Sequence, residues 1–305
     1  MSGGAQGFVG EDAIGINPTE FLTTWNFNNL PTDERSKYYK ETRLGDGTLL
    51  REYWIYAIDR EIEVAPGIFY PAWTYNGQVP GPTIRATEGD TVRIHFINGG
   101  TKSHSIHTHG FHTNAMDGVM SQEQGLLLPD ESYVYEFKAE PFGTHVYHCH
   151  GIPVTEHIAR GLHGAYIVDP LKDTRPKPDK EFVMVMNGFD VNFDGENEIY
   201  AVNSIAFEYV RNPIKVKQGE LVRIYLSNML EFDAINSFHV HANFFEEYPT
   251  GTKLEPDFFT DITVMGQGER SILDMRFKYQ GKYMFHAHKT EFAELGWTGF
   301  FEVEE

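Results

Sequence analysis

The sequence predicts an all-β protein made of two tandem β-sandwich or β-barrel domains, and two observations support this fold class. Short segments rich in β-branched and aromatic residues are separated by Gly, Pro, Asn and Asp, which is typical of antiparallel strands and turns. The chain also repeats itself, because four sequence blocks recur in the same order. A length of 305 residues fits two domains that each bury a hydrophobic core.

The predicted strands fall in both halves of the chain. The clearest are residues 91–97, 132–137, 145–148, 221–226 and 272–277. Residues 1–50 are polar and lack clear periodicity, so we expect an N-terminal arm there. We expect domain 1 over residues 51–170, a linker rich in proline and charge over 171–180, and domain 2 over 181–305.

The repeated blocks place the same elements in each half. Residues 82–98 correspond to 213–228, 104–109 to 236–241, 143–150 to 281–288, and 156–164 to 291–299. Chance does not explain four matches in one order. Each half is therefore expected to build the same structural unit.

Composition limits the functions open to this chain. The formal net charge of −19 argues against nucleic acid and anionic membranes as partners. No apolar run approaches the roughly 20 residues of a membrane span, and residues 1–7 lack the features of a signal peptide. The single cysteine, Cys149, excludes an internal disulfide, whereas 14 histidines point to metal chemistry.

Strand parity groups most of these histidines on one side of each domain. Residues i and i+2 of a strand share a face, so a His-x-His pair presents two imidazoles to the same side. The pairs are His107 with His109, His148 with His150, His239 with His241, and His286 with His288. Cys149 and His104 have the opposite parity, so we expect them to meet inside domain 1.

The repeat separates two kinds of metal site. Domain 2 retains both His-x-His pairs but lacks the cysteine and the residues expected around it. His104, Cys149, His157 and Leu162 become Asn236, Ala287, Phe292 and Trp297. The set found only in domain 1 is the His₂Cys arrangement of a type 1, or blue, copper site with a weak or absent axial ligand. We expect the two histidines and Cys149 as its ligands, with Leu162 at the axial position.

The motifs resemble those of the multicopper oxidases, in a two-domain form with blue copper in the first domain. His104-x-x-His107-x-His109-Gly110 and His148-Cys149-His150 resemble the copper motifs of the last domain of laccases. His239-x-His241 and His286-x-His288 resemble those of a laccase first domain. The segment 75–83 is similar to the opening of many multicopper oxidase and copper nitrite reductase domains. The resemblance covers roughly residues 51 to 305.

This resemblance implies two cupredoxin-like, Greek-key domains and a cluster of three coppers that reduces dioxygen to water. It implies type 2 copper on His107 and His239, and type 3 coppers on His109, His148, His150, His241, His286 and His288. About four coppers per chain are expected, one of them type 1. Each domain offers only half of the cluster ligands, so the resemblance implies a ring of three identical subunits.

Two departures from the laccase pattern affect the blue site. The loop from Cys149 to His157 is longer than is usual in laccases and is closer in length to that of copper nitrite reductases. Leu162 stands where both families commonly have methionine. Loss of this weak sulfur ligand is expected to raise the reduction potential of the blue copper.

Other functions remain open on the sequence alone. A copper nitrite reductase-like enzyme usually has an aspartate at the position of His107 and an apolar residue at that of His150, so the oxidase is favoured. A non-catalytic blue copper electron-transfer protein would use only the type 1 site. The electron donor is open among phenols, metal ions, small nitrogen compounds such as hydroxylamine or nitrite, and a partner cupredoxin.

The remaining candidates have less specific patterns. Asp117 resembles an acid that relays protons near type 2 copper, although Asp-Gly is equally a turn signal. Packing or surface roles are expected for the histidines without a histidine counterpart, namely His95, His112, His145 and His163. We expect an extracytoplasmic location, periplasmic or secreted, with the signal peptide absent from this sequence.

Overall fold

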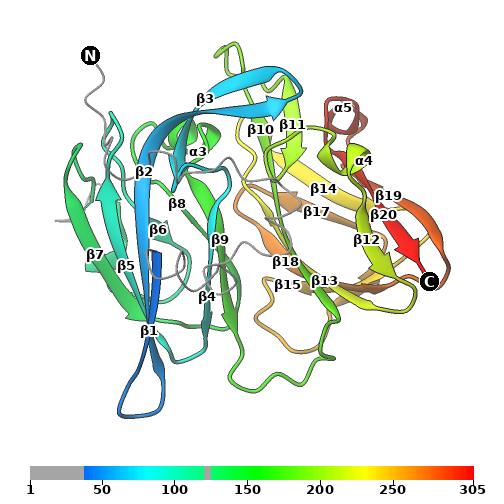
Figure 1. Cartoon of the computed structure of the whole chain (residues 1–305), viewed down its shortest axis with the longest axis horizontal. Coiled ribbons are helices and arrows are strands. Elements are labelled where there is room, and N and C mark those ends of the chain that lie inside the picture. The colour runs from blue at the N-terminus through cyan, green and yellow to red at the C-terminus, as the bar shows by residue number, and fades with distance from the viewer. Residues whose placement is uncertain (1–37, 120–124) are drawn as a thin grey trace. The chain divides into compact units, whose positions relative to one another are not determined.

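The computed structural model describes residues 38–119 and 125–305, and these residues form two all-β units (Figure 1). The first unit contains described residues from 38–62 and 71–172, and the second contains residues 63–70 and 173–305. The predicted all-β class is confirmed. In the described part of the chain, no helix is long and apolar enough to cross a membrane.

The first unit contains a five-stranded and a four-stranded sheet. The five-stranded sheet has the order β1-β2-β5-β7, with β3 paired to β2, and the other has the order β4-β9-β8-β6. Their bounds are β1 (Tyr39–Arg43), β2 (Leu49–Ala65), β3 (Ile68–Tyr75), β4 (Gly81–Thr87), β5 (Thr91–Asn98), β6 (His107–Thr108), β7 (Ser132–Lys138), β8 (Gly143–His148) and β9 (His163–Asp169). The short helices are η1 (Asn114–Met116) and α3 (Val154–Ala159).

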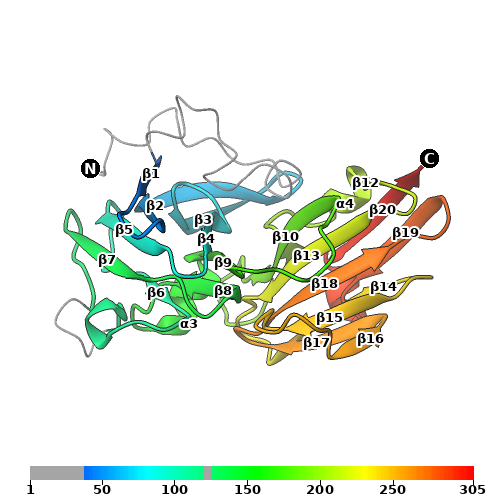
Figure 2. The same cartoon turned by 90° about the horizontal axis from the view of Figure 1, so that it is seen from below.

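The second unit has a six-stranded sheet in the order β11-β10-β13-β18-β15-β16 and a five-stranded sheet in the order β12-β20-β19-β14-β17 (Figure 2). Their bounds are β10 (Lys180–Phe189), β11 (Ile199–Val202), β12 (Ile214–Lys217), β13 (Leu221–Asn228), β14 (Ile235–Val240), β15 (Phe245–Pro249), β16 (Phe258–Thr260), β17 (Ile262–Gly266), β18 (Arg270–Arg276), β19 (Gly281–His286) and β20 (Thr298–Glu304). The helices are α4 (Glu208–Arg211) and α5 (Thr290–Glu294).

The sequence repeat is also a repeat of strand pairing. β5 pairs parallel with β2 and antiparallel with β7, and β13 pairs in the same senses with β10 and β18. The histidine-bearing strands correspond as well, because β6 pairs with β8 as β14 pairs with β19. Gly89 and Gly219 open the corresponding turns with φ of +88° and +80°, a conformation that favours glycine.

All five strands singled out in the sequence overlap observed strands, namely β5, β7, β8, β13 and β18. Residues 1–37 of the predicted N-terminal arm (1–50) lie outside the described residues. Its final part differs from the expectation, because β1 pairs with β2 from Tyr39 to Arg43. Tyr39 packs its ring 5.0 Å from that of Tyr53, so a single buried aromatic anchors this otherwise exposed strand.

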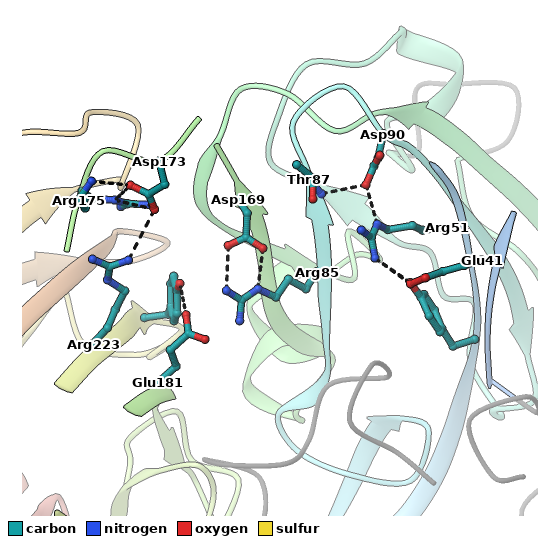
Figure 3. A network of polar contacts seen from close by, with 12 residues as sticks. Glu41, Arg51, Arg85, Thr87, Asp90, Asp169, Asp173, Arg175, Glu181 and Arg223 are labelled. Atoms are coloured by element: carbon teal, nitrogen blue, oxygen red, sulfur yellow. Dashed lines mark hydrogen bonds and ion pairs between the residues drawn. The ribbon is translucent and has the colours of Figure 1, made fainter. Parts of the chain in front are cut away.

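Arginine–carboxylate ion pairs link strands within each unit, and Figure 3 shows the pair of Arg85 and Asp169 in the first unit. In the first unit, Arg85 donates two hydrogen bonds of 2.8 Å to Asp169, across the β4–β9 pair. In the second unit, Arg223 donates bonds of 2.7 and 2.6 Å to the carboxylate of Asp274, and both side chains are almost completely buried. A buried pair of this kind is costly to break by removing one partner.

Arg223→Leu is therefore expected to lower the free energy of unfolding by about 3–5 kcal/mol, because it leaves a buried carboxylate without its partner. The repeat supplies a control, since Arg93 occupies the same position in β5 and pairs with the exposed Glu136 and with Glu52. Glu52 keeps two other partners, His95 and Lys40, when Arg93 is removed. Arg93→Leu is expected to cost less than about 1 kcal/mol. Urea titrations followed by circular dichroism measure both, and equal losses would contradict this account.

Candidate metal site

The predicted blue-site ligands converge inside the first unit. The Sγ of Cys149 lies 3.1 Å from Nδ1 of His157 and 3.8 Å from Nδ1 of His104, and the two Nδ1 atoms are 3.3 Å apart. All three side chains are buried, and Cys149 belongs to the hydrophobic core of this unit. Three potential ligand atoms thus face one small volume that is shielded from water.

The local chain geometry explains how these residues meet. Cys149 directly follows β8, whereas α3 carries His157 back over it. Backbone N–H groups of Ser105 and Gly151 donate to the cysteine sulfur over 3.4 and 3.3 Å. Gly151 is required there, because a Cβ at this position would lie 2.2 Å from the His157 ring.

The walls of this site are apolar. The ring of Trp73 lies edge-on to both imidazoles, with centroid distances of 5.4 Å to His104 and 4.8 Å to His157. Leu162, the expected axial residue, is fully buried, and its carbonyl accepts the N–H of Cys149 over 2.9 Å. Its own N–H donates to the carbonyl of His157, so the backbone ties Leu162 to two of the proposed ligands.

The protonation states of these groups suit a metal such as copper. Burial lowers the pKa of His104 to about 3, and burial also lowers the pKa of His157. Burial raises the pKa of the Cys149 thiol to about 11, although backbone N–H donors oppose this rise. Two neutral imidazoles and a thiol whose sulfur accepts N–H groups fit the His₂Cys donor set of type 1 copper.

Copper uptake at this site is therefore expected to release the thiol proton. Between about pH 7 and pH 9, the affinity of the apoprotein for Cu(I) should rise about tenfold per pH unit, because the thiol is protonated and His104 is neutral throughout. Competition titrations with a Cu(I) chelator at several pH values measure this slope. Cys149→Ser should remove it, and an unchanged slope in that variant would exclude Cys149 as the ligand responsible.

The four paired histidines of the first unit form one cluster on the other side of the same strands. His107 and His148 are cross-strand partners in β6 and β8, with ring centroids 5.1 Å apart. His109 presents Nε2 at 3.4 Å from Nε2 of His148, and the ring of His150 lies 5.4 Å from that of His107. We call these four residues the first histidine face.

The second unit repeats this arrangement closely. His239 and His286 are cross-strand partners with centroids 5.4 Å apart, and His288 lies 5.3 Å from His239. Nε2 of His241 lies 2.9 Å from Nε2 of His286. His286 and His288 are 6.0 Å apart, as are His148 and His150 in the first unit. These four residues of the second unit are the second histidine face.

Backbone carbonyls fix the tautomer of four of the eight rings. Because a carbonyl only accepts, each Nδ1 must carry the proton, which leaves Nε2 with a free lone pair. The four pairs are His107 with Asp117, His148 with Cys149, His239 with Asp261, and His286 with Ala287, at 2.6 to 2.9 Å. His107, His109 and His148 offer ligand nitrogens that all lie within 4.8 Å of one another, as do His239, His241 and His286, so each histidine face fits a bound cation.

The structure also identifies residues that support these rings, and of these the sequence analysis named only Asp117. Asp117 places Oδ1 3.1 Å from Nδ1 of His107, and Asp261 places Oδ2 3.8 Å from Nδ1 of His239. The hydroxyl of Ser105 accepts the N–H of His150, and that of Ser237 accepts the N–H of His288. Both serines occupy the same position of the repeat, and this match is the signal that could have identified them.

In the second unit, Ala287, Phe292 and Trp297 stand at the positions of Cys149, His157 and Leu162, and Asn236 stands at that of His104. Phe292 and Trp297 are buried, and the ring of Phe292 stacks on Tyr200 with centroids 3.9 Å apart. The surrounding backbone bonds are retained, because Ala287 N–H donates to Trp297 and Trp297 N–H donates to Phe292. The side chains alone therefore explain why this unit offers no His₂Cys site.

The other histidines lie apart from the blue-site ligands. His95 stacks on Trp54, Nε2 of His145 donates to the carbonyl of Pro141 over 2.9 Å, and His163 is buried beside β8. His112 lies nearer the first histidine face than expected, with its ring 6.4 Å from that of His107.

One acidic cluster lies outside these sites. Asp190, Asp194 and Glu198 gather in the β10–β11 connection. Their oxygens accept backbone N–H groups of that turn, so they already have a structural role.

Comparisons with known proteins agree with this architecture. A family model described as multicopper oxidase matches residues 60–173, and a second model with that description matches residues 173–305. A solved structure of a multicopper oxidase is 52% identical, with a TM-score of 0.89, over 95% of this chain and 98% of the other. The likeness to this structure confirms two tandem cupredoxin-like domains.

Copper nitrite reductases are also similar. The structure of one from Nitrosomonas europaea is 28% identical, with a TM-score of 0.78, over 84% of this chain and 94% of the other. The copper-containing nitrite reductase of Neisseria gonorrhoeae is 31% identical over 76% of this chain. The match covers 62% of that protein, so this chain spans less than two thirds of its length.

Proposed function

Because the chain belongs to the multicopper oxidase family, we propose that it oxidises a donor by one-electron steps at a type 1 copper and reduces dioxygen to water at a trinuclear copper cluster. The observation that carries this proposal is the pair of matching histidine faces, four imidazoles each, beside a single His₂Cys site. When bound, copper supplies single-electron transfer at the His₂Cys site and four-electron reduction of dioxygen at the cluster.

The residues of the blue site hold and shield its ligands. Trp73 and Leu162 exclude water from the ligand atoms, and the N–H groups of Ser105 and Gly151 stabilise a thiolate on Cys149. Cys149 lies between His148 and His150 in the chain, so two covalent paths join the blue site to the first histidine face. The proposed type 1 ligands are His104, Cys149 and His157.

The histidine faces orient ligands, and one acid is placed to hold a proton. The proposed ligands are His107 and His239 for type 2 copper, and the other six paired histidines for type 3 copper. The carbonyls of Asp117 and Asp261 fix the rings of His107 and His239 with Nε2 available. The Asp117 carboxylate lies beside His107, where Oδ1 is able to accept and return a proton during dioxygen reduction.

A complete cluster needs one first face and one second face, and we propose that they come from neighbouring subunits of a homotrimer. Each face alone presents four imidazoles, and in the second unit His241 and His288 are exposed. Exposed aromatic residues lie close in sequence to His241, where Phe244 stacks on Phe259 with centroids 5.3 Å apart. Exposed apolar side chains beside a half-site are typical of a subunit interface.

Reduction of nitrite is the second candidate, because copper nitrite reductases are among the similar proteins. His107 and His150 favour dioxygen as the substrate. They complete the four imidazoles of the first histidine face, whereas a mononuclear copper site does not need all four. One experiment separates the two candidate reactions. The protein receives an electron donor (a phenol, Fe(II), hydroxylamine or a reduced cupredoxin) together with either dioxygen, or nitrite under argon. Four donor electrons per dioxygen consumed support the proposal, whereas nitric oxide formed from nitrite without dioxygen uptake contradicts it.

Leu162→Met is expected to lower the reduction potential of the blue copper, because it adds a weak sulfur ligand at the proposed axial position. A redox titration that follows the blue absorption band measures the shift. Leu171→Met is the matched control, since Leu171 is exposed and lies outside the site. An unchanged potential in Leu162→Met would show that another residue occupies the axial position.

A further inference from the structure

The second unit contains a cavity of about 490 Å³ that the metal chemistry does not use. Its walls come from β15, β16 and β18 of the six-stranded sheet and from β17 of the five-stranded sheet. A volume of this size is typical of sites for small organic molecules, which usually occupy about 300–1,000 Å³. Met265 and Ile262 form an apolar part of the cavity wall. The exposed ring of Phe258 also lines the cavity.

A buried carboxylate lies in this wall. Glu247 is 7% exposed, although it is in the middle of β15, opposite Leu273 of β18. Its Oε1 accepts the hydroxyl of Thr263 over 2.6 Å. Within residues 38–119 and 125–305, no Lys, Arg or His side chain makes an ion pair with Glu247. A buried carboxylate with a single neutral donor retains most of its acceptor capacity.

A second polar group in the lining of this cavity has no hydrogen-bond partner among the described residues. Ser271, whose strand partner in β15 is Pro249, is 1% exposed, and its Oγ has no hydrogen-bond partner. Both Glu247 and Ser271 line the cavity, together with Glu269 and Arg270. Arg270 interacts with its neighbour Glu269, so in the part of the chain that the structure describes Glu247 supplies the charge of the lining that no neighbouring charge balances. Buried polar groups in folded proteins are almost always paired, so the unpaired hydroxyl of Ser271 and the remaining acceptor capacity of Glu247 favour a ligand that donates hydrogen bonds.

We propose that this cavity binds a small organic ammonium compound with an apolar body. The ammonium group would donate to Glu247 and Ser271, and the apolar part would lie against Met265 and Ile262. A cation satisfies the buried carboxylate as a neutral donor cannot, because charge-assisted hydrogen bonds are the stronger class. A bare metal ion fits less well, because it requires about six oxygen ligands and would leave most of the cavity unfilled.

Benzylammonium, benzyl alcohol and benzoate test this proposal on the copper-loaded, full-length protein by isothermal titration calorimetry. Benzylammonium is expected to bind at least tenfold more tightly than benzyl alcohol, and benzoate is expected not to bind. Glu247→Gln should weaken benzylammonium at least tenfold. Glu246→Gln is the matched control, because Glu246 is the exposed neighbour on the opposite face of β15, and it should leave affinity unchanged.

Equal affinities for the amine and the alcohol, or no loss in Glu247→Gln, would overturn the proposal. Failure of all three probes to bind would also overturn it. A crystal of the wild-type protein soaked with 4-bromobenzylammonium supplies a test that needs no variant. Bromine scattering between β15 and β17 supports the site, and bromine found only elsewhere contradicts it.

Discussion

Cys149→Ser is expected to abolish the blue absorption and all turnover while the cluster coppers remain bound. The sulfur lies 3.1 Å from Nδ1 of His157 in a buried apolar site, so no other residue in the described part of the chain supplies a thiolate there. Absorbance near the blue band, electron paramagnetic resonance and dioxygen uptake measure the change together. Loss of the blue band with unchanged dioxygen uptake would show that electrons enter elsewhere.

Cys149→Ser tests the blue site, and His286→Ala tests the second histidine face independently of the blue site. Its unit has Asn236, Ala287 and Phe292 at the blue-site positions, so the variant should remain blue. Dioxygen reduction should nevertheless stop, because the ring that faces His241 across 2.9 Å is lost. The donor should still reduce the blue copper once. Bleaching of the protein, or normal dioxygen uptake, would refute the assignment of the second face.

Mixing two inactive variants is expected to restore activity if neighbouring subunits share each cluster. His109→Ala damages only the first face and His241→Ala damages only the second, while both leave the blue-site ligands intact. Random co-assembly of equal amounts joins an intact first face to an intact second face at about one quarter of the interfaces in a closed ring. Co-expressed, differently tagged variants should therefore regain about a quarter of wild-type dioxygen uptake.

The controls for that experiment come from the same proteins. Each variant expressed alone should be inactive, and mixing the two after purification should restore activity only as fast as subunits exchange. Light scattering should give a trimer in every case. Co-assembled trimers that stay inactive would contradict a cluster shared between subunits.

Much of this architecture was predictable because it follows from strand parity and repetition. The i, i+2 rule predicts His107 and His109 on one side of the strand and Cys149 on the other side. In the structure the two histidine rings lie 5.3 Å apart, and Cys149 lies in the hydrophobic core. The repeat separated the shared histidines from the residues found only in the first unit. Both inferences depend on local periodicity, which the sequence displays directly.

Long-range features were not predictable in the same way. The polar pattern of β1 predicts that it belongs to the arm. Its pairing with β2 depends on the packing of Tyr39 against Tyr53, which the pattern does not show. Asp261 lies outside the four repeat blocks, so its hydrogen bond to His239 depends on the path of β16 and β17. In the sequence Glu247 resembles an ordinary surface glutamate. It is buried because it lies on the face of β15 that points into the second unit.

The copper content of the purified, loaded protein tests the central claim most directly. Quantification by inductively coupled plasma mass spectrometry, normalised to chain concentration, should give about four coppers per chain, since the His₂Cys site holds one and each pair of histidine faces holds three. Two per chain would indicate a mononuclear centre beside the blue site, as in a nitrite reductase-like enzyme. One per chain would leave only the blue site, and either result would contradict the trinuclear cluster.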